Sequence, residues 1–183
     1  PLGWVGRMMV WHEATVLAAA QDLRGVPALL GRYGRTGILR QYIPGRPLTR
    51  DMKVDSRFFE EFFRLLAELH GRGIAYVDLE KPENIILGDD GLPYLIDFQV
   101  AFRVPKRFLG DTLPLRWMRR ALQSGDLYHA RKHLRRLMQD ELSDDEIAAS
   151  RKKPLAVRVG NMLHAPLKKL RRRIIGKRNT SAE

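Results

Sequence analysis

The most informative part of the chain is YVDLEKPENIILGDDGLPYLIDFQ, residues 76–99. It contains two short apolar runs, 85–87 and 94–96, separated by the turn sequence GDDG at 88–91. An Asp-Gly pair between apolar runs is typical of a β-hairpin, because glycine adopts the positive φ that tight turns need. The sequence therefore predicts that the two runs pair as antiparallel strands.

Such a hairpin collects oxygen-bearing side chains at its open end. The expected register pairs Leu87 with Tyr94 and Ile85 with Ile96. Asn84 and Asp97 then share the open end, where opposed Cβ atoms are about 5 Å apart and two side chains can hold one hard cation such as Mg²⁺. Asp78, just before the hairpin, can act on a hydroxyl group. On the hairpin alone, ordinary turn and cap roles for these residues are the alternative interpretation.

Helical patterns surround the hairpin. Helices are expected over 8–23, 56–70, 113–123, 126–139, 143–150 and 156–175, and extended runs over 28–30 and 38–42. Either Asp55 or Ser56 can cap the second helix, whose apolar stripe predicts a core position. The sequence YIPGRPL, residues 42–48, is expected to break regular structure. His129 and His133 share a helix face without a carboxylate ligand beside them, so ordinary helix-surface roles are expected.

Composition narrows the class of protein. The chain has 183 residues, 44% of them hydrophobic, which is enough to bury a core. It contains no cysteine, so a disulfide framework and a thiolate metal site are excluded, and a reducing compartment is favoured. Its apolar stretches are far shorter than the roughly 20 residues needed to span a bilayer. We therefore expect a cytoplasmic protein.

The net charge of +12 lies almost wholly after residue 100 and suggests an anionic partner. The segment 157–178 mixes aliphatic and basic residues, so it is a candidate for contact with an anionic membrane surface, peripheral at the inner face. A solvated helix that closes the C-terminal half is the alternative, because Pro166 interrupts the amphipathic pattern. Nucleic-acid binding is not expected, since the segment lacks stacking aromatic residues.

The motifs together carry a family resemblance. LHGRGIAYVDLEKPENIILGDDGLPYLIDFQ, residues 69–99, resembles the catalytic core of the protein-kinase-like superfamily, with a loop Asp, an Asn and an Asp-Phe in the same order. ILRQYIPGRPL, residues 38–48, resembles the hinge between two lobes, and SGDLYHARKH, residues 124–133, resembles a helix that carries a buried Asp. Within the superfamily, the chain resembles bacterial small kinases related to the lipopolysaccharide-core sugar kinases and the RIO kinases.

The resemblance implies a fold and its division into parts. The expected class is α+β, a protein-kinase-like fold with a truncated N-terminal lobe and a mainly helical C-terminal lobe. Residues 1–48 would form the partial N-terminal lobe and the hinge. Residues 49–183 would form the C-terminal lobe, with the catalytic hairpin and the basic C-terminal segment.

The resemblance also implies a site and an activity. Asp78 would be the catalytic-loop Asp that accepts or orients the proton of the substrate hydroxyl, and Lys81 would neutralise the transferring phosphoryl group. Asn84 and Asp97 would hold Mg²⁺ on the phosphates of ATP, and Glu13 would be the cofactor-binding glutamate of the regulatory helix. The implied reaction is ATP-dependent transfer of a phosphoryl group to a hydroxyl of a protein Ser or Thr, or of a bacterial lipopolysaccharide-core sugar.

Departures from the family pattern keep a second interpretation open. Tyr76 and Val77 stand where the family usually has His and Arg, and neither a Gly-rich phosphate loop nor a strand Lys precedes Glu13. The missing Lys favours a catalytically impaired pseudokinase, which would act as a binding or scaffold module. Retention of all three polar residues of the hairpin site favours the enzyme.

Overall fold

The computed structural model describes residues 3–103 and 112–138, together with the single residues 142, 147 and 154. The elements in chain order are α1 (Gly3–Ala19), β1 (Leu29–Tyr33), β2 (Gly37–Arg40), β3 (Gly45–Pro47), α2 (Ser56–Gly71), β4 (Ile74–Ala75), the 3₁₀ turn η1 (Pro82–Asn84), β5 (Ile85–Gly88), β6 (Pro93–Leu95), β7 (Phe102–Arg103) and α3 (Leu113–Leu137). The predicted helices over 143–150 and 156–175, and the basic segment 157–178, lie outside the described residues apart from Ile147.

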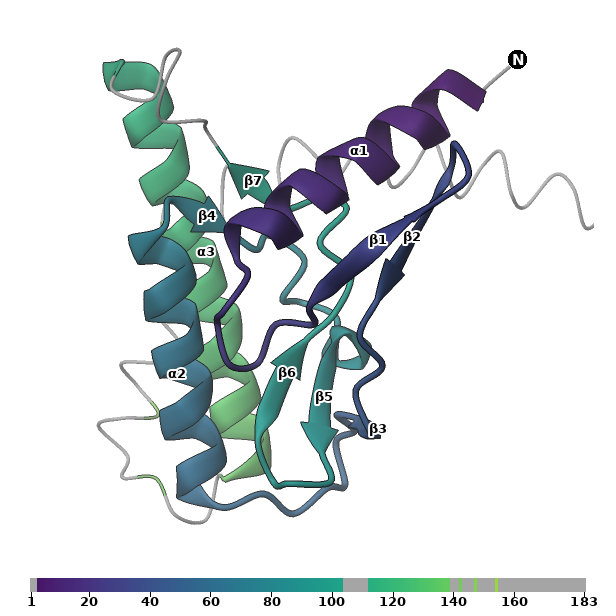
Figure 1. The fold of residues 1–183 in the computed structure, drawn as a ribbon. Helices are drawn as coiled ribbons and strands as arrows, with labels where there is room; N and C mark the ends of the chain where they lie inside the picture. Colours follow the sequence, from purple (N-terminus) through teal and green to yellow (C-terminus); the bar gives the residue numbers. More distant parts are fainter. Residues whose placement is uncertain (1–2, 104–111, 139–141, 143–146, 148–153, 155–183) are drawn as a thin grey trace, which may run out of the picture.

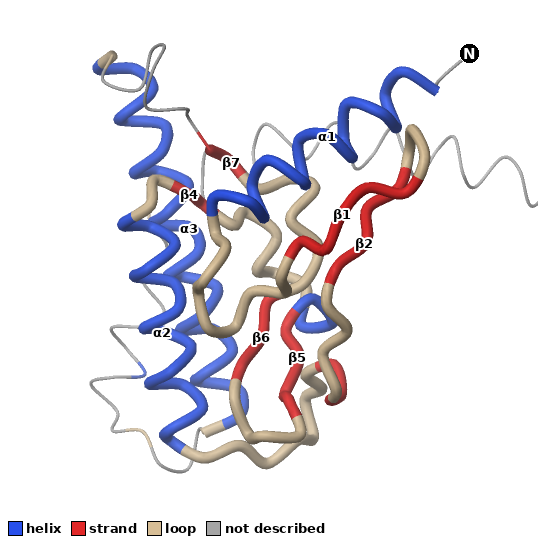
Figure 2. The backbone as a smooth tube through the Cα atoms, in the orientation of Figure 1, coloured by secondary structure: helices blue, strands red, loops and turns tan. Residues whose placement is uncertain are grey.

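Helices and antiparallel sheets make up the fold (Figures 1 and 2). The helices α2 and α3 lie side by side, and the β5–β6 hairpin lies next to α2. The strands in the described part of the chain form three small sheets, in the orders β1-β2, β3-β5-β6 and β4-β7. The predicted α+β class is therefore confirmed, and the arrangement is compatible with a protein-kinase-like fold. No helix in the described part of the chain is long and apolar enough to cross a membrane.

The central core helix is α2, as its apolar stripe predicts. Its buried residues are Phe58, Phe59, Phe62, Leu65, Leu66 and Leu69. Asp55 caps it, because the Asp55 Oδ1 accepts a hydrogen bond of 2.9 Å from the backbone N–H of Phe58. The apolar spacing predicts a buried stripe of Phe59, Phe62, Phe63, Leu66 and Leu69, of which Phe63 is only partly buried. The sequence therefore located this helix and its cap, and the buried face also includes Phe58 and Leu65.

The N-terminal elements also follow the sequence. The helix expected over 8–23 is α1, which begins and ends a few residues earlier. The two extended runs form the antiparallel pair β1 and β2, joined by a turn at Gly34, whose φ is +60°. Helix α1 packs against this pair, which brings one face of α1 next to the end of β2.

Two predictions of helix and loop structure were wrong. The separate helices over 113–123 and 126–139 are one continuous helix, α3. Ser124 does not interrupt it, because its hydroxyl donates to the carbonyl of Ala121 at 2.7 Å and so bonds within the helix. The segment YIPGRPL is not irregular throughout, since β3 within it pairs with β5. A Cβ at Gly45 would lie 2.4 Å from the carbonyl oxygen of Leu87, so this close pairing requires glycine.

The hairpin forms where predicted, with a register one residue different. Its pairs are Ile85 with Leu95, Ile86 with Tyr94 and Leu87 with Pro93. Leu87 pairs with Pro93 instead of Tyr94 because two hydrogen bonds fix a shorter turn. Gly88 N–H donates to Leu92 O at 2.9 Å, and Asp90 Oδ1 accepts from Leu92 N–H at 3.1 Å. A slip of one residue turns each side chain of a strand to the other face. Asn84 is consequently opposite Ile96, whose N–H donates to Asn84 O at 3.0 Å, and Asp97 lies one residue beyond.

Candidate active site

A buried carboxylate on α3, that of Asp126, anchors the loop that follows β4. Asp126 is only 1% exposed. Its Oδ2 accepts from Tyr76 N–H at 2.8 Å and from His70 Nε2 at 3.0 Å, and its Oδ1 accepts from Val77 N–H at 2.8 Å. Val77 has a φ of +73°, which is rare for a β-branched residue. The carboxylate thus holds a sharp bend immediately before Asp78, and the buried Asp implied for residues 124–133 is present.

Tyr76 joins this loop to the segment that carries Asp97. Its hydroxyl donates to the carbonyl of Ile96, and its ring meets the ring of Phe98 edge-on with centroids 5.1 Å apart. Both rings are fully buried. Burial raises the pKa of the Tyr76 hydroxyl, and the nearby carboxylates raise it further, so this group stays a neutral donor.

Asp78, Lys81 and Asn84 converge on one carboxylate oxygen. The Oδ2 of Asp78 accepts from Lys81 Nζ at 2.6 Å and from Asn84 Nδ2 at 3.1 Å. The turn η1 brings Asn84 back toward Asp78, since Asn84 N–H donates to Lys81 O at 3.2 Å. The hydrogen bond to Asp78 raises the pKa of Lys81, with further contributions from the charges of Asp78, Asp97 and Glu83. Lys81 is therefore held as a cation beside Asp78.

Asp97 lies near this cluster without joining its hydrogen bonds. It has a φ of +65°, and its Oδ1 accepts from Gln99 N–H at 3.3 Å. Its negative charge acts on both Lys81 and Tyr76. Among the described residues, no hydrogen bond joins the carboxylate of Asp97 to the side chain of Asp78 or Asn84. The expected direct opposition of Asn84 and Asp97 is therefore wrong by the one-residue register difference.

The donor set around this loop suits a hard cation that also has phosphate ligands. Asn84 uses its Nδ2 toward Asp78, which leaves its Oδ1 for a cation, and Asp97 keeps Oδ2 free of the bond to Gln99. Mg²⁺ typically takes one or two protein oxygens and completes its shell with water and phosphate. In the part of the chain that the structure describes, no group of three or more His, Asp or Glu side chains could hold a metal by itself. Asn84 Oδ1 and Asp97 Oδ2 are therefore the side-chain oxygens at this loop that could contribute to such a shell.

Glu13 has a cationic partner that the sequence analysis missed. Glu13 is 4% exposed on α1, and its Oε1 lies 3.5 Å from the Nη1 of Arg40 at the end of β2. The positive charge of Arg40 also acts on Tyr76, where it opposes the rise in the pKa of the hydroxyl. The family pattern places a strand Lys before Glu13, whereas here the partner is an Arg that follows it in the chain and ends a strand packed against the same helix.

The histidines correct another expectation. His133 is 3% exposed, not on the surface, and its Nε2 lies 2.8 Å from the carbonyl oxygen of Leu79. His129 is half-buried, and its Nδ1 has no hydrogen-bond partner among the described residues. His12 Nε2 lies 2.7 Å from Ala101 O. Helical spacing alone did not reveal that His133 is buried, because the loop at 76–84 covers one side of α3.

Buried His133 predicts a loss of stability in acid. Burial lowers its pKa below the ordinary value of 6.5, against the opposing effect of the hydrogen bond to Leu79. The unfolded chain therefore binds this proton at higher pH than the folded chain, and the folded state loses stability as the pH falls below about 6.5, by at most about 1.4 kcal/mol per pH unit for one proton. Urea unfolding between about pH 7.5 and pH 5.5 measures the slope. The slope should be shallower in His133→Gln, and equal slopes would contradict the assignment.

Comparison with known proteins gives partial matches to protein kinases. No protein-family model matches the chain. The chain is 40% identical over 73 residues to a probable cAMP-dependent protein kinase catalytic subunit of Encephalitozoon cuniculi, a match that covers 36% of this chain and 22% of that protein. It is 35% identical over 81 residues to the serine/threonine-protein kinase OXI1 of Arabidopsis thaliana, covering 39% and 19%. It is 38% identical over 88 residues to the serine/threonine-protein kinase WAG2 of the same plant, covering 48% and 18%.

These matches support a relationship to the protein-kinase-like superfamily. The chain spans about a fifth of the length of the curated relatives it matches. Their names are those of protein kinases, and they do not support the narrower resemblance to lipopolysaccharide-core and RIO kinases. The α+β fold, the geometry of the loop at 76–84 and the partial sequence matches are all compatible with the protein-kinase-like superfamily.

Proposed function

We propose that this chain carries the phosphotransfer site of a kinase that moves the γ-phosphoryl group of ATP to a Ser or Thr hydroxyl of a protein. The observation that carries the proposal is the convergence of Lys81 and Asn84 on the carboxylate of Asp78, with the charge of Asp97 close by. The partial matches to serine/threonine kinases favour a protein acceptor over a lipopolysaccharide-core sugar. A cytoplasmic setting, where ATP is plentiful, is part of the proposal.

Each residue has a role that its surroundings suit. Asp78 accepts or orients the proton of the attacking hydroxyl, and Lys81 lies where it can neutralise charge on the transferring group. Asn84 and Asp97 would hold Mg²⁺, which supplies charge neutralisation at the phosphates when bound. Because this chemistry depends on position and charge, it needs no covalent nucleophile.

Glu13 is proposed to act through Arg40. The buried carboxylate of Glu13 pairs with the guanidinium of Arg40, which is partly exposed and would offer a positive charge to the phosphates. In this proposal, residues 1–48 form the partial N-terminal lobe with a hinge at 42–48, and residues 49–183 form the second lobe. The anionic membrane contact of 157–178 stays a prediction, since that segment lies outside the described residues.

The proposal is tested by phosphoryl transfer from γ-labelled ATP. The chain is incubated with ATP, Mg²⁺ and generic protein acceptors, with purified lipopolysaccharide in a parallel reaction, and labelled amino acids are identified after hydrolysis. We expect phosphoserine or phosphothreonine. Label in lipopolysaccharide alone would contradict the protein acceptor, nucleotide binding without transfer would indicate the pseudokinase, and absence of nucleotide binding would overturn the proposal.

A further inference from the structure

Two adjoining cavities lie between α1 and the β1–β2 pair, away from the Asp78 cluster. The first has a volume of about 410 Å³ and is lined by residues of α1 and β1 together with Arg103 of β7. The second has a volume of about 350 Å³ and extends toward the β1–β2 turn. Arg32 lines both, and the two cavities together are called here the Arg32 site. Each volume falls within the range of about 300–1,000 Å³ that is typical of small-molecule sites.

The lining of the Arg32 site is strongly cationic. Its arginines are Arg7, Arg32, Arg35 and Arg103. No acidic residue lines either cavity in the described part of the chain. Two arginines outside these cavities form ion pairs, Arg40 with Glu13 and Arg64 with Glu61. The arginines of the Arg32 site have no ion-pair partner among the described residues, so positive charge is concentrated at this site.

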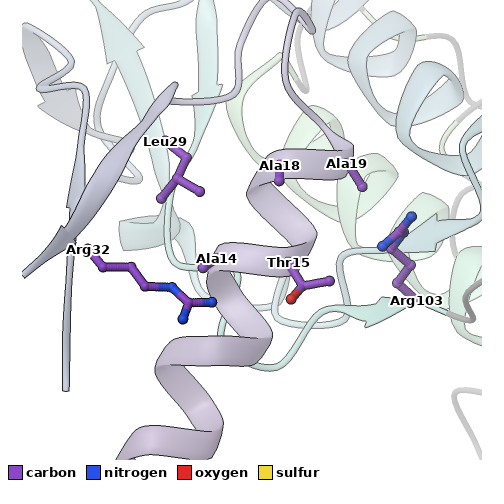
Figure 3. Close-up of a pocket in the computed structure, with 7 residues that line it drawn as sticks. All are labelled: Ala14, Thr15, Ala18, Ala19, Leu29, Arg32 and Arg103. Atoms are coloured by element: carbon purple, nitrogen blue, oxygen red, sulfur yellow. The ribbon is translucent and has the colours of Figure 1, made fainter. Parts of the chain in front are cut away.

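Two guanidinium groups flank the small residues of α1 that form the base of the first cavity. Figure 3 shows Arg32 and Arg103 on either side of α1, each with its guanidinium turned toward the helix. The floor between them consists of the small residues Ala14, Thr15, Ala18 and Ala19. Short side chains there leave room for a ligand. The Thr15 hydroxyl already donates to Trp11 O at 2.8 Å, so the donors available to a ligand are the guanidinium groups.

We propose that the Arg32 site binds a ligand that carries phosphate groups. Arginine presents a planar fork of N–H donors that matches phosphate oxygens in a bidentate manner. A carboxylate has one charge and two oxygens, which would leave the second guanidinium without a partner. A polyphosphate or a multiply phosphorylated headgroup presents enough oxygens and charge for Arg32 and Arg103 together. The exposed indole of Trp11, which lines the second cavity, adds an apolar wall beside the anionic groups.

The test uses inorganic tripolyphosphate as the probe and the full chain as the protein. Isothermal titration should show binding that weakens with added salt, as expected for charge pairing in a partly open site. Arg32→Gln and Arg103→Gln should each weaken it by about tenfold or more, because each removes a charge-assisted bidentate contact. Arg50→Gln, an exposed arginine outside both cavities, is the matched control and should change affinity by less than about twofold.

Two further arms make the result decisive. Tripolyphosphate should bind Lys81→Gln with wild-type affinity, whereas a loss of affinity in that variant would place the probe at the Asp78 cluster and overturn the proposal. Cosedimentation with phosphatidylcholine vesicles, with and without phosphatidylinositol bisphosphate, separates a lipid headgroup from a free phosphate ligand. Arg32→Lys keeps the charge but loses the fork, so it should bind with intermediate affinity. Equal affinity of the wild type, Arg32→Gln and Arg103→Gln for tripolyphosphate would also overturn the proposal.

Discussion

Replacing Asp78 with Asn should lower the rate of phosphoryl transfer by about 10²–10⁴-fold, the contribution that a positioned acid or base typically makes. The Asn side chain keeps the shape of Asp78 and can still accept from Lys81 and Asn84, whose present bonds to its Oδ2 are 2.6 Å and 3.1 Å. It cannot take up the proton of the hydroxyl. We therefore expect the loss in kcat, with little change in the affinity for ATP and Mg²⁺.

Asp89→Asn is the matched control for this prediction. Asp89 lies exposed in the turn at the far end of the same hairpin, so the change removes the same charge from the same structural unit. Single-turnover kinetics with labelled ATP should show near wild-type transfer for Asp89→Asn. If Asp78→Asn transfers phosphate as fast as this control, Asp78 has no part in the proton transfer.

The second large effect is on stability. Asp126→Ala should lower the free energy of unfolding by about 3–5 kcal/mol, the cost of breaking a buried charged hydrogen-bond group by removing one partner. The change leaves the N–H groups of Tyr76 and Val77 without an acceptor in a site that is 1% exposed, and each such loss is costly. Because these two N–H groups hold the bend before Asp78, the variant should also transfer phosphate poorly.

Urea unfolding followed by circular dichroism measures this change. Asp126→Asn retains one carbonyl oxygen and should be intermediate in stability. Glu68→Gln, an exposed change on α2, should stay within about 0.5 kcal/mol of the wild type. An unfolding free energy for Asp126→Ala within that range would show that the loop is held by other contacts.

The features that sequence alone predicted are those with a local physical cause. The apolar stripe and the Asp55 cap of α2 arise from neighbouring residues, so helical spacing finds them. The β5–β6 hairpin follows from the Asp-Gly turn. The proximity of Asp78, Lys81 and Asn84 also follows from their closeness in sequence, since the η1 turn folds the loop back on itself. Their chemical roles come from the family resemblance and remain proposals.

The features that sequence could not predict depend on packing between distant segments. The ion pair of Glu13 with Arg40 requires α1 to lie against β2. The bond of His133 to Leu79 joins residues 54 positions apart. The hairpin register was missed because the bond of Asp90 Oδ1 to the N–H of Leu92 shortens the turn, and that bond depends on a side-chain conformation.

Titration of the chain with Mn²⁺ and ATP, followed by electron paramagnetic resonance, tests the central claim most directly, because Mn²⁺ accepts the same oxygen ligands as Mg²⁺. We expect the wild type and Asp89→Asn to bind Mn²⁺ together with ATP, and Asp97→Asn to bind the pair about tenfold or more weakly. Equal binding by Asp97→Asn and the wild type, or absence of binding by the wild type, would contradict it.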